Sequence, residues 1–395
     1  MDGEKKKRLR TMDDVPLDGK RVLVRVDFNV VTGDNGKVDP WESYRIEAAL
    51  PTIEELRQRR CKVLLLPHRG RPGDPAEKTD MGPVKKRLED LLHDDVKSVD
   101  QLYGSKLSAI VDGMEHGGVV MLPNVRSDER EESGNEKFAR QISESADAYV
   151  NEAFSVCHRS HVSVSFVPRL IPSCAGRRVV QEVERLGVLK DNPEQPYVAI
   201  ISGSKIETKI GLFYRLLPKV EKICVGGKLA NLLLVAQGVY KEEFPPDDVA
   251  VAKSLLEKGG DKIVLPVDVV VGSEDGLDGV RAIGVDDVPE DAKVYDIGPR
   301  TADLFLVATR MAKTVMWNGP VGVFEVPVYA RSTQAIAQGL AKMDSNRVVG
   351  GGDTVTAIDR LKLRDQFDFV STGGGAMISF LGGEAMPGLE ALSAQ

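Results

Sequence analysis

The sequence predicts an α/β protein in two halves, each built around a parallel sheet flanked by helices. In both halves, short runs rich in Val, Ile and Leu alternate with segments whose apolar residues recur at helical spacing. Strands that alternate with helices in this way are typical of parallel sheets with crossover connections. Between the halves, a helical stripe at residues 178–190 runs into a proline-containing breaker at residues 191–196. A helix followed by a breaker near the middle of the chain indicates a domain boundary.

Length and composition place the chain among ordinary globular proteins. The 395 residues suggest two or three domains, and 42% hydrophobic and 29% charged residues are typical of a soluble protein. A net charge of −7 does not favour a nucleic-acid partner. No apolar run approaches the ~20 residues that span a bilayer. The chain shows no signal-peptide pattern, and its four cysteines lack zinc or disulfide spacing. We therefore expect a cytoplasmic protein with reduced thiols and no membrane partner.

The first predicted strand, residues 21–30, brings polar side chains to its C-terminal end. Asp27 and Asn29 lie there among Val and Phe residues. In open α/β sheets, ligands bind at this end of the strands. Arg45 then opens a helical pattern over residues 46–56. These three polar residues are therefore candidates for a ligand site.

Later strands of the first half also lead into basic residues. We expect these strands at residues 61–66, 119–122 and 148–150. Together with the helix start, the strand ends supply five basic residues: Arg45, His68, Arg71, Arg126 and Arg159. Five such residues at one edge of a sheet, in an acidic protein, predict a pocket for a highly anionic small molecule. Arginine suits this role because its planar fork binds carboxylate and phosphate groups bidentately.

Two other interpretations of the loop after residue 150 are weaker. Cys157 and His158 could form a nucleophile and its base, but neighbouring residues rarely face each other and no orienting acid is evident. His158 and His161 could bind a metal, but no third ligand is obvious. Local hydrogen bonding within the loop is the favoured role of these histidines.

Glycine-rich turns follow the strands of the second half. Two valines enter the glycine run 350–352, and Asp353 and Thr354 then open a helical pattern. Glycines let the backbone approach a ligand closely, and a helix N-terminus offers unpaired N–H groups with partial positive charge. This combination favours phosphate. Asp353 could either cap the helix or hold a magnesium ion beside the phosphates.

Similar turns recur at residues 202–205, 225–228 and 371–375. The first of them contains Lys205, and Lys209 follows four residues later. On a helix these two lysines would share a face at the N-terminus, where phosphates bind. The spacing of a Walker A loop is absent throughout the chain. We therefore expect a nucleotide site of a different kind in the second half.

At these residues the sequence resembles the phosphoglycerate kinase family over essentially its whole length. The resemblance rests on six stretches in the family's order and spacing: residues 24–30, 68–72, 158–161, 317–325, 350–354 and 371–376. It implies two Rossmann-like α/β domains with parallel sheets flanked by helices, joined by a hinge helix. The domains would comprise residues 1–177 and 193–383, with residues 178–192 as the interdomain helix and linker. The tail, residues 384–395, would return to the first domain.

The resemblance also implies the ligands of each domain. The first domain would bind 3-phosphoglycerate or 1,3-bisphosphoglycerate through Asp27, Asn29, Arg45, His68, Arg71, Arg126 and Arg159. The second would bind Mg-ADP or Mg-ATP through Gly203, Lys205, Lys209, Gly226, Gly227, Asn318, Glu325, Gly351, Gly352, Asp353 and Thr354. Asp353 would be the magnesium ligand. The resemblance further favours a monomer that acts in glycolysis and gluconeogenesis.

The implied reaction is reversible phosphoryl transfer between the acyl phosphate of 1,3-bisphosphoglycerate and ADP. Because the carboxylate is a good leaving group, the chemistry needs in-line positioning and charge neutralisation rather than a strong general base. Catalytic roles would fall to the following residues: Arg45, Lys205, Lys209, Gly351 and Gly374. Since these residues lie on two domains, we expect hinge closure, with the helix at 178–190 and the turn at 296–299 as hinge candidates.

The sequence departs from the family's pattern at five positions: Pro67, Arg69, Glu152, Ser155 and Lys228. None of them carries an assigned role. Glu152 and Ser155 stand where Asp and Gly are common, in the loop that carries Arg159. Substrate affinity is therefore the property that we expect these departures to affect.

Two rival functions are weaker. A dinucleotide-dependent oxidoreductase would carry Gly-x-Gly-x-x-Gly after a strand, and this pattern is not found. A non-catalytic nucleotide-binding relative, acting as an interaction protein, would show eroded charges at the pocket positions. The charged residues of both predicted sites are retained, which favours the enzyme.

Overall fold

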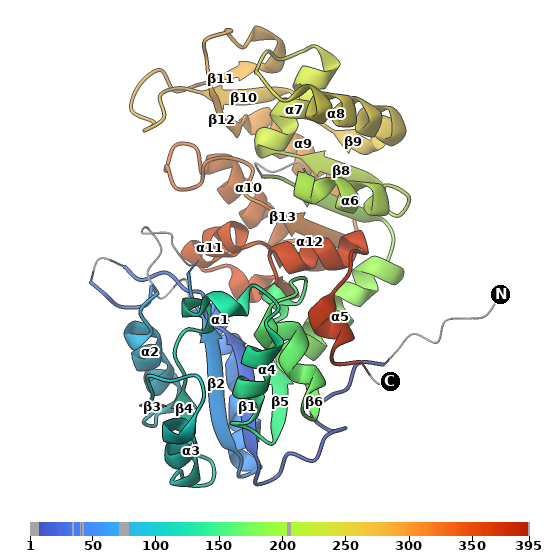
Figure 1. Cartoon of the computed structure of the whole chain (residues 1–395). Coiled ribbons are helices and arrows are strands. Elements are labelled where there is room, and N and C mark those ends of the chain that lie inside the picture. Colours follow the sequence, from blue (N-terminus) through green and yellow to red (C-terminus); the bar gives the residue numbers. More distant parts are fainter. Residues whose placement is uncertain are drawn as a thin grey trace, which may run out of the picture. The chain divides into compact units, whose positions relative to one another are not determined.

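The chain folds into two units, Met1–Glu184 with Ala385–Gln395, and Arg185–Glu384. A computed structural model describes residues 8–33, 35–39, 41, 43–70, 79–203 and 207–393. Each unit contains a six-stranded sheet in which every neighbouring pair of strands is parallel (Figure 1). The predicted α/β class with two parallel sheets is therefore confirmed.

The sheet of the first unit has the strand order β3-β4-β2-β1-β5-β6. Its strands are β1 (Arg21–Asp27), β2 (Lys62–His68), β3 (Lys97–Ser98), β4 (Val119–Met121), β5 (Ala148–Asn151) and β6 (Ser173–Ala175). Val22, Val24 and Val26 of β1 pack into the main hydrophobic core of this unit. Because side chains alternate along a strand, Arg25 and Asp27 point to the opposite face.

Helices cover this first sheet (Figure 1). The α-helices that lie wholly in this unit are α1 (Tyr44–Gln58), α2 (Gly82–Leu92), α3 (Ser105–Asp112), α4 (Glu136–Ser143) and the short α13 (Pro387–Glu390). The C-terminal segment belongs to the same unit, because Arg10 N donates to Leu392 O at 3.0 Å and Gly388 N donates to Cys157 O at 2.9 Å. The last residues of the chain thereby pack beside the loop that follows β5.

The sheet of the second unit has the strand order β15-β14-β13-β7-β8-β9. Its strands are β7 (Tyr197–Ile201), β8 (Lys222–Val225), β9 (Ile263–Val264), β13 (Thr314–Asn318), β14 (Asn346–Gly350) and β15 (Phe369–Ser371). The helices of this unit are α6 (Glu207–Leu216), α7 (Gly227–Gln237), α8 (Pro246–Gly259), α9 (Pro299–Thr309), α10 (Arg331–Leu340), α11 (Gly352–Arg360) and α12 (Gly375–Gly382). Because strands and helices alternate along the chain, the helices α7, α11 and α12 each follow directly after a strand with a glycine-rich end.

A three-stranded antiparallel sheet also belongs to the second unit, and the sequence did not predict it. It has the order β11-β10-β12, with β10 (Asp268–Val271), β11 (Arg281–Gly284) and β12 (Val294–Ile297). Asp268 is the first residue of β10. Its carboxylate accepts hydrogen bonds from Arg300 N at 3.1 Å and Thr301 N at 2.8 Å. Asp268 thus stabilises the N-terminus of α9.

The helix predicted at residues 178–190 is α5 (Arg177–Asp191), and the boundary between the units falls inside it. The turn at 296–299 connects β12 to α9 within the second unit. It is therefore a poorer hinge candidate than α5. All four cysteines are buried and free. Among the described residues, no helix is both long enough and apolar enough to cross a membrane.

Candidate functional site

A charged cluster in the first unit forms where β1, β2 and α1 meet. Arg45 Nη1 donates to Asp27 Oδ2 at 2.7 Å, and His68 Nε2 lies 3.4 Å from Asp27 Oδ1. Asn29 N donates to the same carboxylate at 3.0 Å. His68 is the last residue of β2, because the strand continues through Pro67 beyond its predicted end. The structure therefore brings together four of the residues expected to bind the anionic substrate.

Arg126 joins this cluster through the backbone after β2. Asn29 Oδ1 accepts from Gly70 N at 2.9 Å, and Arg126 Nη1 donates to Gly70 O at 2.7 Å. Arg126 Nε is buried without a hydrogen-bond partner among the described residues. Arg159 is exposed, and its positive charge helps to lower the pKa of Arg126. Arg71 lies outside the described residues, so its predicted role is untested.

Burial and neighbouring charges set the protonation of this cluster. Burial acts to raise the pKa of Asp27, but the nearby Arg45 guanidinium, together with the other charges and hydrogen bonds around the carboxylate, outweighs burial, and the pKa is about 2. Burial, with help from Arg25 and Arg126, lowers the pKa of His68 well below its ordinary value against the opposing effect of Asp27. Burial and two neighbouring arginines, Arg25 and Arg159, lower the pKa of Arg126 to about 10. At neutral pH the cluster therefore keeps an excess of positive charge, which suits an anionic ligand.

Sequence reasoning missed two buried arginines beside this cluster. Arg25 Nη1 lies 2.7 Å from His68 Nδ1. The available signal was a charged residue between two strand valines, two positions before Asp27. Arg69, a departure from the family's pattern, donates from Nε to Val30 O at 3.0 Å and from Nη2 to Thr32 Oγ1 at 3.2 Å. Arg69 therefore ties together the loops after β1 and β2.

The loop after β5 holds a cysteine and a glutamate that are both buried. Burial raises the pKa of Cys157 to about 12, so its thiol stays protonated and is unsuited to act as a nucleophile. Burial also raises the pKa of Glu152 to about 8, although Glu152 Oε1 accepts a hydrogen bond from Arg178 N at 3.0 Å. Glu152 thereby connects the loop that carries Arg159 to the first turn of α5.

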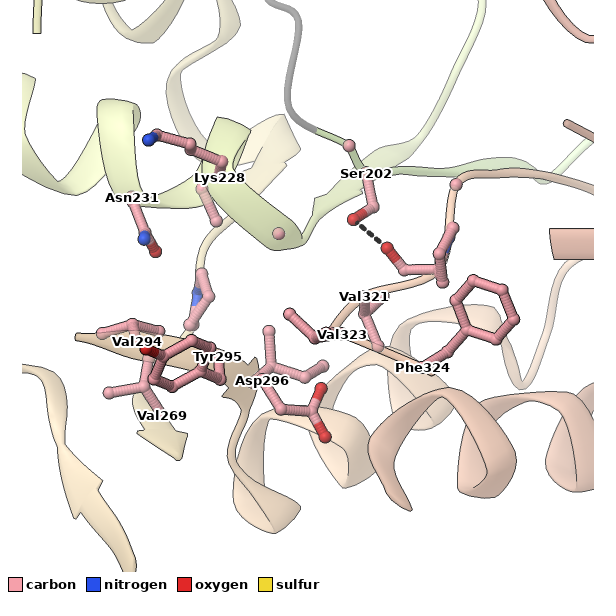
Figure 2. A pocket seen from close by; sticks show the side chains of 18 of the residues that line it. Ser202, Lys228, Asn231, Val269, Val294, Tyr295, Asp296, Val321, Val323 and Phe324 are labelled. Carbon is pink, nitrogen blue, oxygen red and sulfur yellow. Dashed lines mark hydrogen bonds between the residues drawn. The ribbon is translucent and has the colours of Figure 1, made fainter. Parts of the chain in front are cut away.

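A pocket of about 970 Å³ in the second unit lies at the ends of β7 and β13 and at the N-termini of α7, α11 and α12. Figure 2 shows Ser202 at its edge, where the hydroxyl donates to Pro320 O at 2.5 Å. The predicted residues that line this pocket are Gly203, Lys209, Gly227, Asn318, Glu325, Gly351, Gly352, Asp353, Thr354 and Gly374. Gly226 does not line it and instead packs against Val321. Lys205 lies outside the described residues.

Close backbone approach at the pocket requires glycine at two positions. Gly319 has a φ of +95°, and a Cβ there would lie 2.1 Å from Ser202 O. Gly227 has a φ of +61°, and a Cβ there would lie 2.7 Å from Ser202 Oγ. Left-handed backbone of this kind is strained for other residues. These glycines bring the ends of β7 and β13 together at the start of α7.

Lys209 is the buried cation of this pocket and lies in the first turn of α6. Its Nζ donates to Ser202 O, and to Asn318 Oδ1 at 3.2 Å. Burial lowers the pKa of Lys209 from 10.5 to about 8, against an opposing effect of Asp353. The ammonium group is therefore held at the strand ends, beside the glycine turns and the helix N-termini.

The wall opposite the glycine turns comes from α7 and from the antiparallel sheet, and sequence reasoning missed it. Figure 2 shows Lys228 and Asn231 of α7 on one side and Val294 and Tyr295 of β12 on another. Lys228 Nζ lies 3.3 Å from Glu242 Oε1. The mixture of apolar side chains with a few polar groups is typical of small-molecule pockets. The wall depends on antiparallel pairing of short strands, which the strand–helix alternation does not reveal.

Asp353 is the carboxylate that the family resemblance implies as the magnesium ligand. It is exposed, lines the pocket and lies in the first turn of α11, whereas Gly351 occupies the cap position, so the capping interpretation is wrong. Within the described residues, no group of three or more His, Cys, Asp and Glu side chains could hold a metal. A single carboxylate beside phosphate-binding turns fits Mg²⁺, which commonly takes one or two protein carboxylates together with substrate phosphates.

Comparison with known proteins gives one consistent result. A sequence model of the family described as phosphoglycerate kinase matches residues 12–384. The chain is 42% identical over 391 residues to the phosphoglycerate kinase of Pelotomaculum thermopropionicum, covering 97% of this chain and 98% of that protein. It is 41% identical over 390 residues to that of Moorella thermoacetica, with the same coverage.

Solved structures agree with the sequence comparison. Phosphoglycerate kinase from Coxiella burnetii superposes with a TM-score of 0.80 at 34% identity, covering 98% of this chain and 99% of that one. The enzyme from Pyrococcus horikoshii superposes with a TM-score of 0.88 at 27% identity, covering 97% and 98%. The sequence and structure comparisons thus agree over almost the full length, and the chain belongs to the phosphoglycerate kinase family.

Proposed function

We propose that this kinase catalyses reversible, magnesium-dependent transfer of a phosphoryl group between 1,3-bisphosphoglycerate and ADP, giving 3-phosphoglycerate and ATP. The observation that carries the proposal is the pocket of the second unit, where a buried lysine, glycine turns and helix N-termini converge. Each of these features favours phosphate. The competing role, a nucleotide-binding protein without activity, is disfavoured because the charged residues of both sites are present.

The charged cluster of the first unit would bind the glycerate substrate. Arg45, Arg126 and Arg159 would neutralise its carboxylate and phosphate groups, and Arg71 would add a further positive charge. Asp27 stays ionised and holds the Arg45 guanidinium at 2.7 Å. Asn29 and the neutral His68 would complete the set of polar contacts. The positive charge of this cluster supports an acceptor that carries several negative charges.

The pocket of the second unit would bind the nucleotide with its phosphates at the N-termini of α11 and α12. Lys209, with the backbone N–H groups near Gly351 and Gly374, would neutralise charge on the moving phosphoryl oxygens. Lys205 would support the nucleotide phosphates, and Glu325 would also contact the nucleotide. Gly203, Gly227 and Asn318 would lie around the adenosine. Asp353 would hold magnesium, which neutralises and orients phosphate oxygens when bound. Charge stabilisation and in-line positioning suffice because an acyl phosphate has a good leaving group.

The proposed reaction needs groups from both units around one phosphoryl group. Arg45 belongs to the first unit and Lys209 to the second. Water must also be excluded so that the phosphoryl group passes to the substrate rather than to solvent. We therefore propose closure of the units about α5, which crosses their boundary.

The cellular setting is also a proposal. The buried, free cysteines support a reducing compartment, which we take to be the cytoplasm. The net charge of −7 supports small-molecule substrates rather than nucleic acid as partners. We propose that the enzyme acts as a monomer, as the family resemblance implies.

Turnover of the purified protein tests the proposal. The assay would combine ATP, Mg²⁺ and 3-phosphoglycerate, and would couple the acyl phosphate to its reducing dehydrogenase and NADH. We expect NADH oxidation that requires all three components, and loss of activity on chelation of Mg²⁺. ADP release that does not depend on 3-phosphoglycerate would indicate an ATPase instead. Nucleotide binding without turnover would support the non-catalytic alternative.

A further inference from the structure

His68 lies in a chain of contacts that starts at a buried arginine and ends at Arg45. Arg25 Nη1 is 2.7 Å from His68 Nδ1, and His68 Nε2 is 3.4 Å from Asp27 Oδ1. The other oxygen of Asp27 accepts from Arg45 Nη1 at 2.7 Å. This series of contacts therefore connects the buried Arg25 to Arg45, the side chain that is assigned to the reaction.

Only one proton arrangement of His68 is compatible with the first contact. A guanidinium group has N–H donors and no acceptor, and it stays charged in proteins. His68 Nδ1 must therefore accept, which leaves the proton of the neutral ring on Nε2. An imidazolium ring would place two donors against each other at 2.7 Å. The Nε2–H group consequently faces Asp27.

Arg25 is held so firmly that it has little freedom to change this arrangement. Its side chain is 0% exposed, its Nε donates to Ser163 Oγ at 2.7 Å, and its Nη1 also donates to Val26 O at 2.8 Å. Glu131 lies 3.8 Å from Arg25 Nη2 and accepts from Ser163 Oγ at 2.5 Å. A guanidinium enclosed in this way acts on the site through His68 rather than by touching a ligand.

We propose that Arg25 is a positioning residue that fixes His68 in its Nε2–H form, so that His68 presents a neutral donor and orients Asp27 and Arg45. This role rests on the proposed function of the charged cluster. The charged groups that face His68 are Arg25, Arg45, Arg126 and Asp27. Because burial and the three arginines disfavour the imidazolium form, His68 is a hydrogen-bond donor and not a source of positive charge.

The first test is the tautomer of His68 in the wild-type protein, read from ¹⁵N chemical shifts of the imidazole nitrogens at pH 7. The chain has five histidines, and a His68→Gln variant identifies the His68 signals by their loss. We expect a protonated Nε2 and an unprotonated Nδ1. A protonated Nδ1, or a cationic ring, would overturn the proposal whether or not any variant folds. This measurement needs no turnover, so it is independent of the proposed reaction.

The second test is a double-mutant cycle between Arg25 and His68, measured as kcat/KM for 3-phosphoglycerate. Arg25→Met should lower this value about 10- to 100-fold, as loss of an orienting partner typically does. In a His68→Gln background, an amide N–H replaces Nε2–H without needing Arg25, so the further loss should be below about 3-fold. Equal losses in both backgrounds would contradict the proposal.

Arg21→Met is the matched control, because Arg21 lies on the same strand and pairs with Asp147 at 2.6 Å, away from His68. It should change neither the His68 tautomer nor kcat/KM by more than about 2-fold. If Arg25→Met fails to fold, the wild-type tautomer decides the question. If the wild type has the expected tautomer but no turnover, the proposed function fails while the placement of the His68 proton stands.

Discussion

Burial disfavours the charged form of both Lys209 and Asp27, but only at Asp27 do the neighbouring groups outweigh it. Lys209 is buried with its Nζ near neutral oxygens, so burial lowers its pKa to about 8. Asp27 is also buried, but Arg45 together with the other groups around the carboxylate outweighs burial and keeps its pKa at about 2. A lysine with a lowered pKa favours binding of a negative group, because the phosphates would restore the lost electrostatic stabilisation.

The lowered pKa of Lys209 predicts a pH dependence. In the free enzyme the ammonium form is lost as pH rises through about 8. We therefore expect kcat/KM for Mg-ATP to fall above about pH 8, approaching tenfold per pH unit. Lys209→Arg should remove this alkaline limb, because a guanidinium group stays charged. Parallel profiles of wild type and variant between pH 7 and 9.5 would contradict the role of Lys209.

At the residue scale, the sequence was informative where a polar group follows a strand. Asp27, Arg126 and Lys209 were predicted because strand ends and helix starts are recognisable from local pattern. Arg25 was missed because its role depends on His68, which is distant in sequence and close only across the β1–β2 pair. Arg69 was missed for the same reason, since its partners lie on other loops.

At the scale of elements, α5 begins at a buried carboxyl group. Glu152 Oε1 accepts from Arg178 N at 3.0 Å, and Arg177 N donates to Thr52 Oγ1 at 2.8 Å. A carboxylate would interact favourably with a helix N-terminus, but burial here raises the pKa of Glu152 to about 8. The helix that joins the units therefore starts at a group that is largely neutral at pH 7.

This group makes the stability of the first unit depend on pH. Because the pKa of Glu152 is about 8 in the folded protein against an ordinary 4.5, its contribution is present below pH 4.5 and is lost as pH rises towards 8. The loss is at most about 5 kcal/mol, at about 1.4 kcal/mol per pKa unit. The Glu152→Gln variant should lack this pH-dependent loss. The unfolding free energy of the variant relative to the wild type should therefore increase between pH 4.5 and 8.

Urea unfolding measures this difference when Trp41 alone reports on the first unit. Each of the two proteins would carry Trp317→Phe, since the chain has two tryptophans and Trp317 lies in the second unit. Other groups with a raised pKa, such as Glu131, are common to both proteins and cancel in the comparison. A difference in unfolding free energy that stays constant with pH would show that Glu152 is not the group responsible.

The glycine turn after β13 makes a second prediction at this scale. Gly319→Ala adds a Cβ 2.1 Å from Ser202 O at a φ of +95°. Strain and overpacking together should lower the unfolding free energy of the second unit by about 2–5 kcal/mol and weaken nucleotide binding. Gly238→Ala is the control, because Gly238 has a φ of +79° with open space around it. It should cost only about 1–2 kcal/mol of strain.

Buried Trp317 reports on the unfolding of the second unit in a Trp41→Phe background. If Gly319→Ala and Gly238→Ala unfold at the same urea concentration, the close approach of Gly319 to Ser202 does not contribute to the stability of the second unit. Retained nucleotide affinity in Gly319→Ala would lead to the same conclusion.

Elements differ in how well the sequence predicts them. Most of the parallel strands and α5 were predicted within a few residues, because each repeats a simple local pattern, whereas the short strands β3 and β6 were not predicted. The antiparallel sheet was not predicted, because β10 pairs with β11 and β12 through contacts that no local period encodes. Since β12 and α7 supply one wall of the pocket, that wall was missed together with the sheet.

At the scale of the whole molecule, the proposed chemistry needs groups from both units around one phosphoryl group. Small-angle scattering should show a smaller radius of gyration when 3-phosphoglycerate and Mg-ADP are both present, a pair that cannot react. Either ligand alone is the control and should have a smaller effect, because closure about α5 needs groups from both sites. Identical radii of gyration in the free and doubly liganded protein would exclude closure as proposed.

The central claim is that one phosphoryl group is held from both units, by Arg45 and by Lys209. The most direct measurement is turnover in the coupled assay for Arg45→Ala and Lys209→Ala, together with calorimetric binding of 3-phosphoglycerate and of Mg-ADP to each variant. Arg57→Ala on α1 and Lys258→Ala on α8 would control for the loss of a positive charge. We predict that kcat falls about 10²- to 10³-fold in each test variant, while each still binds the ligand of the other unit. Near-normal turnover in either test variant would contradict the two-sided site.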